Sequence, residues 1–69
     1  MNKRMQFSLK ELRARKDISQ EDLANLAGLT ARTIHNYEKD VANLRSASYS
    51  NIKEIAKALD VEVEDIYLG

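Results

Sequence analysis

The fold of this 69-residue chain is decided by residues 19–38, which read SQEDLANLAGLTARTIHNYE. Apolar residues recur there at helical spacing on both sides of Gly28. Glycine enters the left-handed backbone conformation that ends a helix without strain, and Thr30 can cap the next helix with its hydroxyl. Residues 19–38 therefore predict two short helices joined by a tight turn, the helix-turn-helix arrangement. The inner faces are expected to carry Leu23, Ala24, Leu26 and Ala27 in the first helix, and Ile34 and Tyr37 in the second.

The outer face of the second predicted helix carries side chains that suit the edges of DNA bases. Arginine can donate two hydrogen bonds to guanine, asparagine can pair with adenine in the same bidentate way, and alanine offers a methyl contact for thymine. We expect direct base contacts from Ala31, Arg32, His35 and Asn36. The alternatives are a phosphate contact for Arg32 and a merely solvated side chain for Asn36.

Phosphate contacts are expected from side chains that flank this helix, and such contacts set the register of a protein on DNA. Gln20 and Thr30 begin the two helices, where backbone N–H groups also point outward. Capping alone would explain Thr30. The expected phosphate-binding set is Gln20, Thr30, Lys39 and Arg45.

Residues 19–38 resemble the phage-repressor and Cro (Xre-type) family of helix-turn-helix transcriptional regulators from bacteria and phages. Ser19-Gln20 opens the motif, Leu12-Arg13 precedes it, Ile34 and Glu38 lie in its second helix, and IAKALDV follows at residues 55–61. The resemblance covers about residues 9–68. It implies a compact all-α, five-helix domain of the lambda-repressor type, with the helix-turn-helix at helices 2 and 3. It also implies sequence-specific binding of double-stranded operator DNA and transcriptional regulation, as a repressor. The glycine and proline that usually follow the motif are missing from this chain, where residues 39–48 form a longer turn.

Serine and threonine side chains predict where the other helices begin. Ser8 and Glu11 have the spacing of a capping box, with Phe7 and Leu12 placed for a hydrophobic staple. Ser19 and Asp22 repeat that pattern. A later helix, capped by Ser46, Ser48 or Ser50, is expected to bury Tyr49, Ile52, Ile55, Ala56 and Leu59, and a short fifth helix is expected over about residues 63–68.

Arg13 and Glu38 are predicted to pair inside the fold. Arg13 falls on the buried stripe of the first helix, and Glu38 follows Ile34 by one turn on the inner side of the third. Two unpaired buried charges would be very costly, so a mutual ion pair is the favoured arrangement, and the resemblance implies the same pairing. The alternative is that each side chain extends separately to water.

Length and charge bound the remaining possibilities. A chain this short predicts a single domain over residues 1–69, with its core at about 8–68 and no second module. The net charge is zero, but residues 1–45 carry nine Lys and Arg against six acids, and residues 46–69 carry two against five. This division suits one end that faces DNA and one that does not. The absence of cysteine and of any long apolar segment predicts a cytoplasmic protein with no membrane contact.

Catalysis and metal binding have no support in the sequence. The chain has one histidine, no cysteine and no glycine-rich loop. We therefore expect neither an enzyme nor a cofactor, metal or small-molecule ligand. A homodimer is expected, in solution or only on DNA, through Ile66, Tyr67, Leu68 and the loop around Leu44. The alternative function is an antitoxin-like or other protein-interaction module with the same fold, which would lack salt-dependent DNA affinity.

Overall fold

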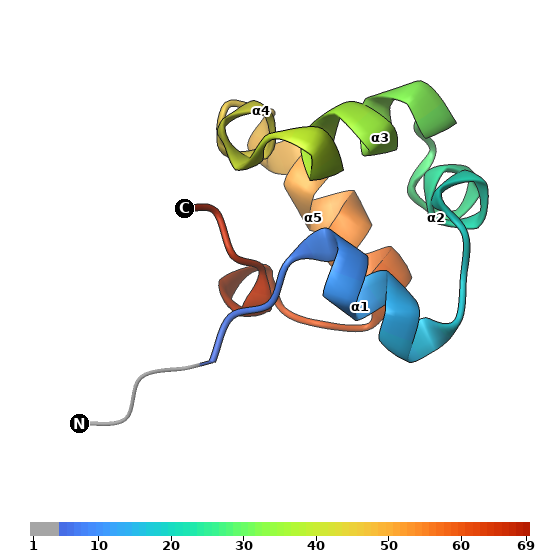
Figure 1. Cartoon of the computed structure of the whole chain (residues 1–69), viewed down its shortest axis with the longest axis horizontal. Coiled ribbons are helices and arrows are strands. Elements are labelled where there is room, and N and C mark those ends of the chain that lie inside the picture. Colours follow the sequence, from blue (N-terminus) through green and yellow to red (C-terminus); the bar gives the residue numbers. More distant parts are fainter. Residues whose placement is uncertain (1–4) are drawn as a thin grey trace.

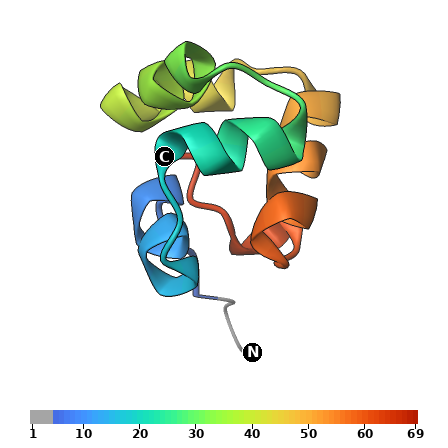
Figure 2. The same ribbon diagram turned by 90° about the vertical axis from the view of Figure 1, so that its right-hand side faces the viewer.

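The computed structural model describes residues 5–69 as an all-α arrangement (Figures 1 and 2). The elements in chain order are α1 (Leu9–Lys16), α2 (Gln20–Ala27), α3 (Ala31–Lys39), α4 (Val41–Arg45), α5 (Tyr49–Leu59) and a 3₁₀ turn, η1 (Val63–Asp65). The only β pairing in this part of the chain is one isolated parallel bridge between Phe7 and Ile66. Figure 1 shows α5 running through the middle of the molecule, with α1 on one side and α3 and α4 on the other.

Local capping explains where α1 and α2 begin and end. The Oγ atom of Ser8 accepts from the Glu11 N–H at 3.2 Å, and the Glu11 carboxylate accepts from the Ser8 N–H at 3.0 Å. Ser19 and Asp22 make the same reciprocal pair at the start of α2. Gly28 ends α2 with a φ of 72°, the left-handed conformation in which only glycine carries no penalty. The predicted capping boxes and the predicted glycine stop are therefore confirmed.

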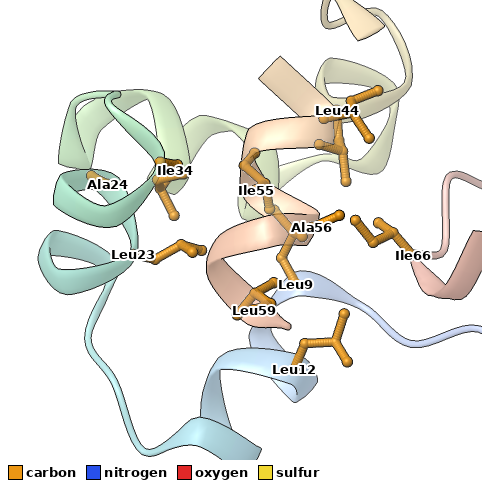
Figure 3. Packing of buried hydrophobic residues seen from close by; sticks show 12 residues of the cluster. Leu9, Leu12, Leu23, Ala24, Ile34, Leu44, Ile55, Ala56, Leu59 and Ile66 are labelled. Carbon is orange, nitrogen blue, oxygen red and sulfur yellow. The ribbon is translucent and has the colours of Figure 1, made fainter. Parts of the chain in front are cut away.

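The core is one cluster of apolar side chains gathered around α5. Figure 3 shows Leu23 and Ile34, from α2 and α3, on one side of Ile55, and Leu9 and Leu12 of α1 near Leu59. The buried set is Leu9, Leu12, Leu23, Ala24, Ala27, Ile34, Leu44, Ile52, Ile55, Ala56, Leu59 and Ile66. This packing fixes the angle at which α2 and α3 meet, so the core determines how α3 is presented to a ligand.

The C-terminal third differs from the sequence prediction in its helices. The predicted long turn at residues 39–48 contains α4, whose N-cap Asp40 accepts from the Ala42 N–H at 2.9 Å. The predicted fifth helix at residues 63–68 is wrong, because only η1 forms there and Ile66 adopts an extended conformation. The total of five α-helices over residues 5–69 is as expected, but α4 takes the place of the predicted last helix.

Two side chains predicted to lie in the core are exposed instead. Leu26 on α2 is 62% exposed, and Tyr49 at the first position of α5 is 67% exposed. In an eight-residue helix the apolar stripe at positions 23, 24 and 27 already fills the space against α3 and α5, so Leu26 falls outside it. Tyr49 is the first residue of α5, and at that end of the helix its side chain remains exposed. Of its three candidate caps, Ser48 is the one that forms, and it accepts from the Asn51 N–H at 3.1 Å.

The two ends of the described chain are joined beside α1. The Phe7 N–H donates to the Asp65 carbonyl and the Tyr67 N–H to the Phe7 carbonyl, both at 2.9 Å. The Arg15 guanidinium lies 3.9 Å from the centre of the Phe7 ring. This junction lies at the end of the molecule away from α3 (Figure 1). Lys3 and Arg4, which contribute to the basic half of the sequence, lie outside the described residues.

The same junction corrects the predicted dimer surface. Ile66 is fully buried and Leu44 is 2% exposed, so neither can supply an exposed apolar contact for a second subunit. Ile66 is buried because its pairing with Phe7 places its side chain in the core. Tyr67, the next residue, remains 47% exposed.

Candidate nucleic-acid interface

One face of α3 is formed by four exposed polar side chains: Arg32, His35, Asn36 and Lys39. Their spacing of three, four and seven residues places them on one side of a helix. We call this set the α3 row. None of these side chains has a hydrogen bond or ion pair within residues 5–69. Ala31, also expected to meet DNA bases, is half-buried and packs against the core.

The opposite side of α3 is fixed to the rest of the fold. Ile34 is completely buried. The Tyr37 hydroxyl accepts from the side-chain amide of Asn51 on α5 at 3.1 Å. At the C-terminal end, the Asn43 side chain of α4 donates to the Asn36 carbonyl at 2.9 Å. The α3 row is therefore carried by a helix whose rotation and tilt are set by α4 and α5.

Arg13 and Glu38 are brought together by the structure in a bidentate ion pair. The Nε and Nη2 atoms of Arg13 donate to the two carboxylate oxygens of Glu38, at 2.7 and 3.0 Å. The third donor, Nη1, reaches the Ile18 carbonyl at 2.9 Å. The side chains are only 15% and 7% exposed. The pair thus links α1, the turn before α2, and the C-terminal half of α3.

The electrostatics of the pair follow from this geometry. Burial alone would raise the pKa of Glu38, but the hydrogen bonds from Arg13 and Gln20, with the positive charges of Arg13 and Lys10, outweigh it and hold this pKa below its ordinary value. The hydrogen bond to Glu38 raises the pKa of Arg13, against the opposing effect of burial. Both groups are therefore charged at neutral pH.

Three of the four expected phosphate contacts fall in different settings. Thr30 caps α3: its Oγ1 accepts from the Thr33 N–H at 3.2 Å and lies 2.9 Å from the Thr33 hydroxyl oxygen. Lys39 lies exposed at the end of the α3 row. Arg45 is exposed at the end of α4, and its Nη1 donates to the Leu68 carbonyl at 3.0 Å, which ties it to the C-terminal tail.

Gln20 makes a contact that sequence reasoning did not find. Its side-chain Nε2 donates to the Glu38 carboxylate at 3.1 Å, across eighteen positions of sequence. No local pattern signals such a contact. The hydrogen bond from the Asn43 side chain to the Asn36 carbonyl was also missed. It forms only because α4 places Asn43 beside the end of α3, and α4 was not predicted.

No group of His, Asp or Glu side chains in residues 5–69 is arranged to hold a metal ion. Within the same residues, no helix has the length and apolar content needed to cross a membrane.

A helix fixed from behind, crossing a second short helix and presenting a row of hydrogen-bond donors, defines a DNA-binding helix-turn-helix domain. The chain matches the family described as "Helix-turn-helix" over residues 9–66. It therefore belongs to the Cro/C1-type, Xre-like helix-turn-helix family, a DNA-binding family and not a catalytic one. Comparison with curated proteins gave no match, and comparison with solved structures gave none either.

Proposed function

We propose that this chain binds a specific double-stranded operator sequence and acts as a transcriptional repressor. The observation that carries the proposal is the α3 row, whose donors have no partner within residues 5–69 on a helix whose other face is fully engaged. A protein of this function works where the DNA is, which in a bacterium is the cytoplasm.

Within the α3 row, Arg32 and Asn36 are proposed to read bases. Arg32 lies in the first turn of α3, the part of a recognition helix that enters the major groove. Asn36 lies one turn later on the same face. His35 borders this pair, and Ala31 is left with at most one methyl contact, because it packs against the core. Lys39, Thr30 and Gln20 are proposed as phosphate contacts that set the register.

Selection from random double-stranded oligonucleotides tests the function directly. The expected result is enrichment of one sequence motif, with affinity that falls steeply as salt rises. A folded chain that enriches no motif and shows no salt-dependent affinity would support the alternative, a protein-interaction module built on the same fold.

We further propose that two copies bind together, on half-sites about one helical turn, or roughly 34 Å, apart. The support is an open, mostly apolar hollow of about 260 Å³, lined by residues of α1, α3, α4 and the tail, to which the exposed Tyr67 contributes. In a two-fold interface each copy contributes the same surface, so an exposed aromatic ring beside an apolar hollow is self-complementary. Sedimentation with and without operator DNA tests this, comparing the wild type with Tyr67→Asp. Non-cooperative binding of one copy to one half-site would contradict it.

A further inference from the structure

A continuous set of hydrogen bonds runs from the inside of the fold to the first residue of α2. Arg13 bonds the Ile18 carbonyl with one nitrogen and the Glu38 carboxylate with two others. The Oε1 atom of Glu38 then accepts a second bond, from Nε2 of Gln20. Gln20 is the half-buried first residue of α2, the helix that crosses α3. A side chain proposed to touch DNA is therefore held by a buried ion pair.

The chemistry of a carboxylate fixes how the Gln20 amide is turned. A charged carboxylate can only accept hydrogen bonds, so the NH₂ end of the amide must face Glu38 and the carbonyl end must face away. The amide group is planar. Fixing one N–H therefore also fixes the direction of the second, which has no acceptor in the described part of the chain.

We propose that Glu38 is a positioning residue for DNA binding, because it holds Gln20 in the orientation that offers its second amide N–H to a DNA phosphate. This inference rests on the proposed function. A free glutamine must give up rotamer freedom when it binds, whereas a glutamine already held by Glu38 has given it up on folding. Arg13 has a second role in this arrangement, since its charge cancels that of Glu38 and removes the repulsion between the carboxylate and the phosphate.

A double-mutant cycle tests the coupling between Gln20 and the ion pair. Gln20→Ala is made in the wild type and in a chain carrying Arg13→Met with Glu38→Leu, a change that removes both charges together and keeps the site apolar. We expect Gln20→Ala to weaken operator binding roughly tenfold in the wild type, the value of one hydrogen bond to a charged group. In the pair-free chain we expect a loss of less than about twofold. Equal factors in both backgrounds, or no loss in the wild type, would overturn the proposal.

Gln6→Ala is the matched control. Gln6 also uses its side-chain amide to donate within the fold, to the Glu64 carbonyl at 3.2 Å, but this partner belongs to η1 and not to α2 or α3. This variant should bind operator DNA as the wild type does. An equal loss in Gln6→Ala would show that the effect is not specific to Gln20, and would also overturn the proposal.

A spectroscopic measurement decides the orientation on the wild-type chain alone. The side-chain NH₂ resonances of Gln20 should shift as acid protonates Glu38, because their hydrogen-bond acceptor changes. Those of Asn51 provide the comparison, since that amide donates to the Tyr37 hydroxyl and to no carboxylate. A Gln20 signal that stays still, or moves only as the Asn51 signal does, would mean that Glu38 does not hold the amide.

Failure of this inference is distinguishable from failure of the proposed function. If Arg32→Ala changes the preferred base while the Gln20 cycle is additive, the function stands and only the positioning role is lost. If selection from random oligonucleotides enriches no motif, the proposed function itself fails, whatever the outcome of the Gln20 cycle.

Discussion

The two faces of α3 show how one short helix divides its polar side chains between stability and recognition. On the inner face, Glu38 has three hydrogen bonds and Tyr37 has one. On the outer face, the α3 row leaves its donors to solvent. No buried side-chain nitrogen or oxygen in residues 5–69 lacks a partner. A charge is therefore tolerated inside this small domain only when it is paired, whereas the α3 row keeps its donors on the surface, where a ligand can reach them.

The largest effect, a loss of stability, is expected from removing the Glu38 carboxylate on the inner face of α3. Glu38→Ala leaves the Arg13 guanidinium, which is only 15% exposed, without its carboxylate. We expect a loss of about 3–5 kcal/mol in the free energy of unfolding, because an uncompensated charge remains in a site with little access to water. Urea or thermal unfolding followed by circular dichroism measures it.

The control for that experiment removes the second charge as well. Adding Arg13→Met to Glu38→Ala should recover much of the lost stability, because no unpaired charge then remains. If Glu38→Ala alone melts within about a degree of the wild type, the ion pair contributes nothing to stability. The inner face of α3 would then not differ from the outer face in its importance for folding.

Acid pH should also lower the free energy of unfolding, by less than Glu38→Ala does. The pKa of Glu38 lies below its ordinary value of 4.5 in the folded state, so its ionised form stabilises the fold. That contribution is complete above about pH 4.5 and is lost as pH falls through the folded-state pKa. The difference in unfolding free energy between the wild type and Glu38→Ala should therefore narrow below pH 4.5. A difference that stays constant down to pH 3 would show that the carboxylate is not preferentially charged in the folded state.

The outer face should respond in the opposite way, with affinity changing and stability staying constant. Arg32→Ala should alter the unfolding free energy by no more than about 0.5 kcal/mol, since the side chain is exposed and has no partner within residues 5–69. It should cost about 1–3 kcal/mol in binding to the selected operator and relax the preference at one base pair. Titration against the operator and its single-base variants, at fixed salt, measures both.

Arg32→Lys sharpens the same test. Lysine keeps the positive charge but lacks the planar pair of donors that guanine requires. A large loss therefore indicates base recognition, and a small uniform loss indicates phosphate contact. If neither Arg32 variant changes the base preference, Arg32 has no role in recognition.

The parts of this molecule that local chemistry determines were predictable from its sequence. Ser8, Ser19 and Gly28 act within three or four residues of their partners, and all three were assigned correctly. The Arg13–Glu38 contact is long-range, but two inward charges of opposite sign in so small a core have few other partners.

The errors arose where position depends on distant elements. Helical periodicity places Leu26 and Tyr49 near an apolar stripe, yet only the packing of α2 against α3 and α5 decides where that stripe ends. The five residues of α4 are too few to show a period, although Asp40 is a cap signal that could have located it. In the tail, the pairing of Ile66 with Phe7 displaced the predicted helix, and no pattern in residues 63–68 reveals a partner almost sixty positions away.

The smallest effect is expected at Thr30, the N-cap residue of α3. Its hydroxyl caps the helix through the Thr33 N–H, so Thr30→Ala should cost about 1 kcal/mol in stability, whereas Thr30→Ser should keep the cap and cost little. Because the Thr30 and Thr33 hydroxyls also bond each other, only one of the two hydroxyl protons is engaged between them, and the other is free for a phosphate. Thr30→Ala should therefore also weaken binding by a similar factor on every DNA sequence, measured under conditions where both proteins are fully folded. A loss of stability with unchanged affinity would assign Thr30 to capping alone.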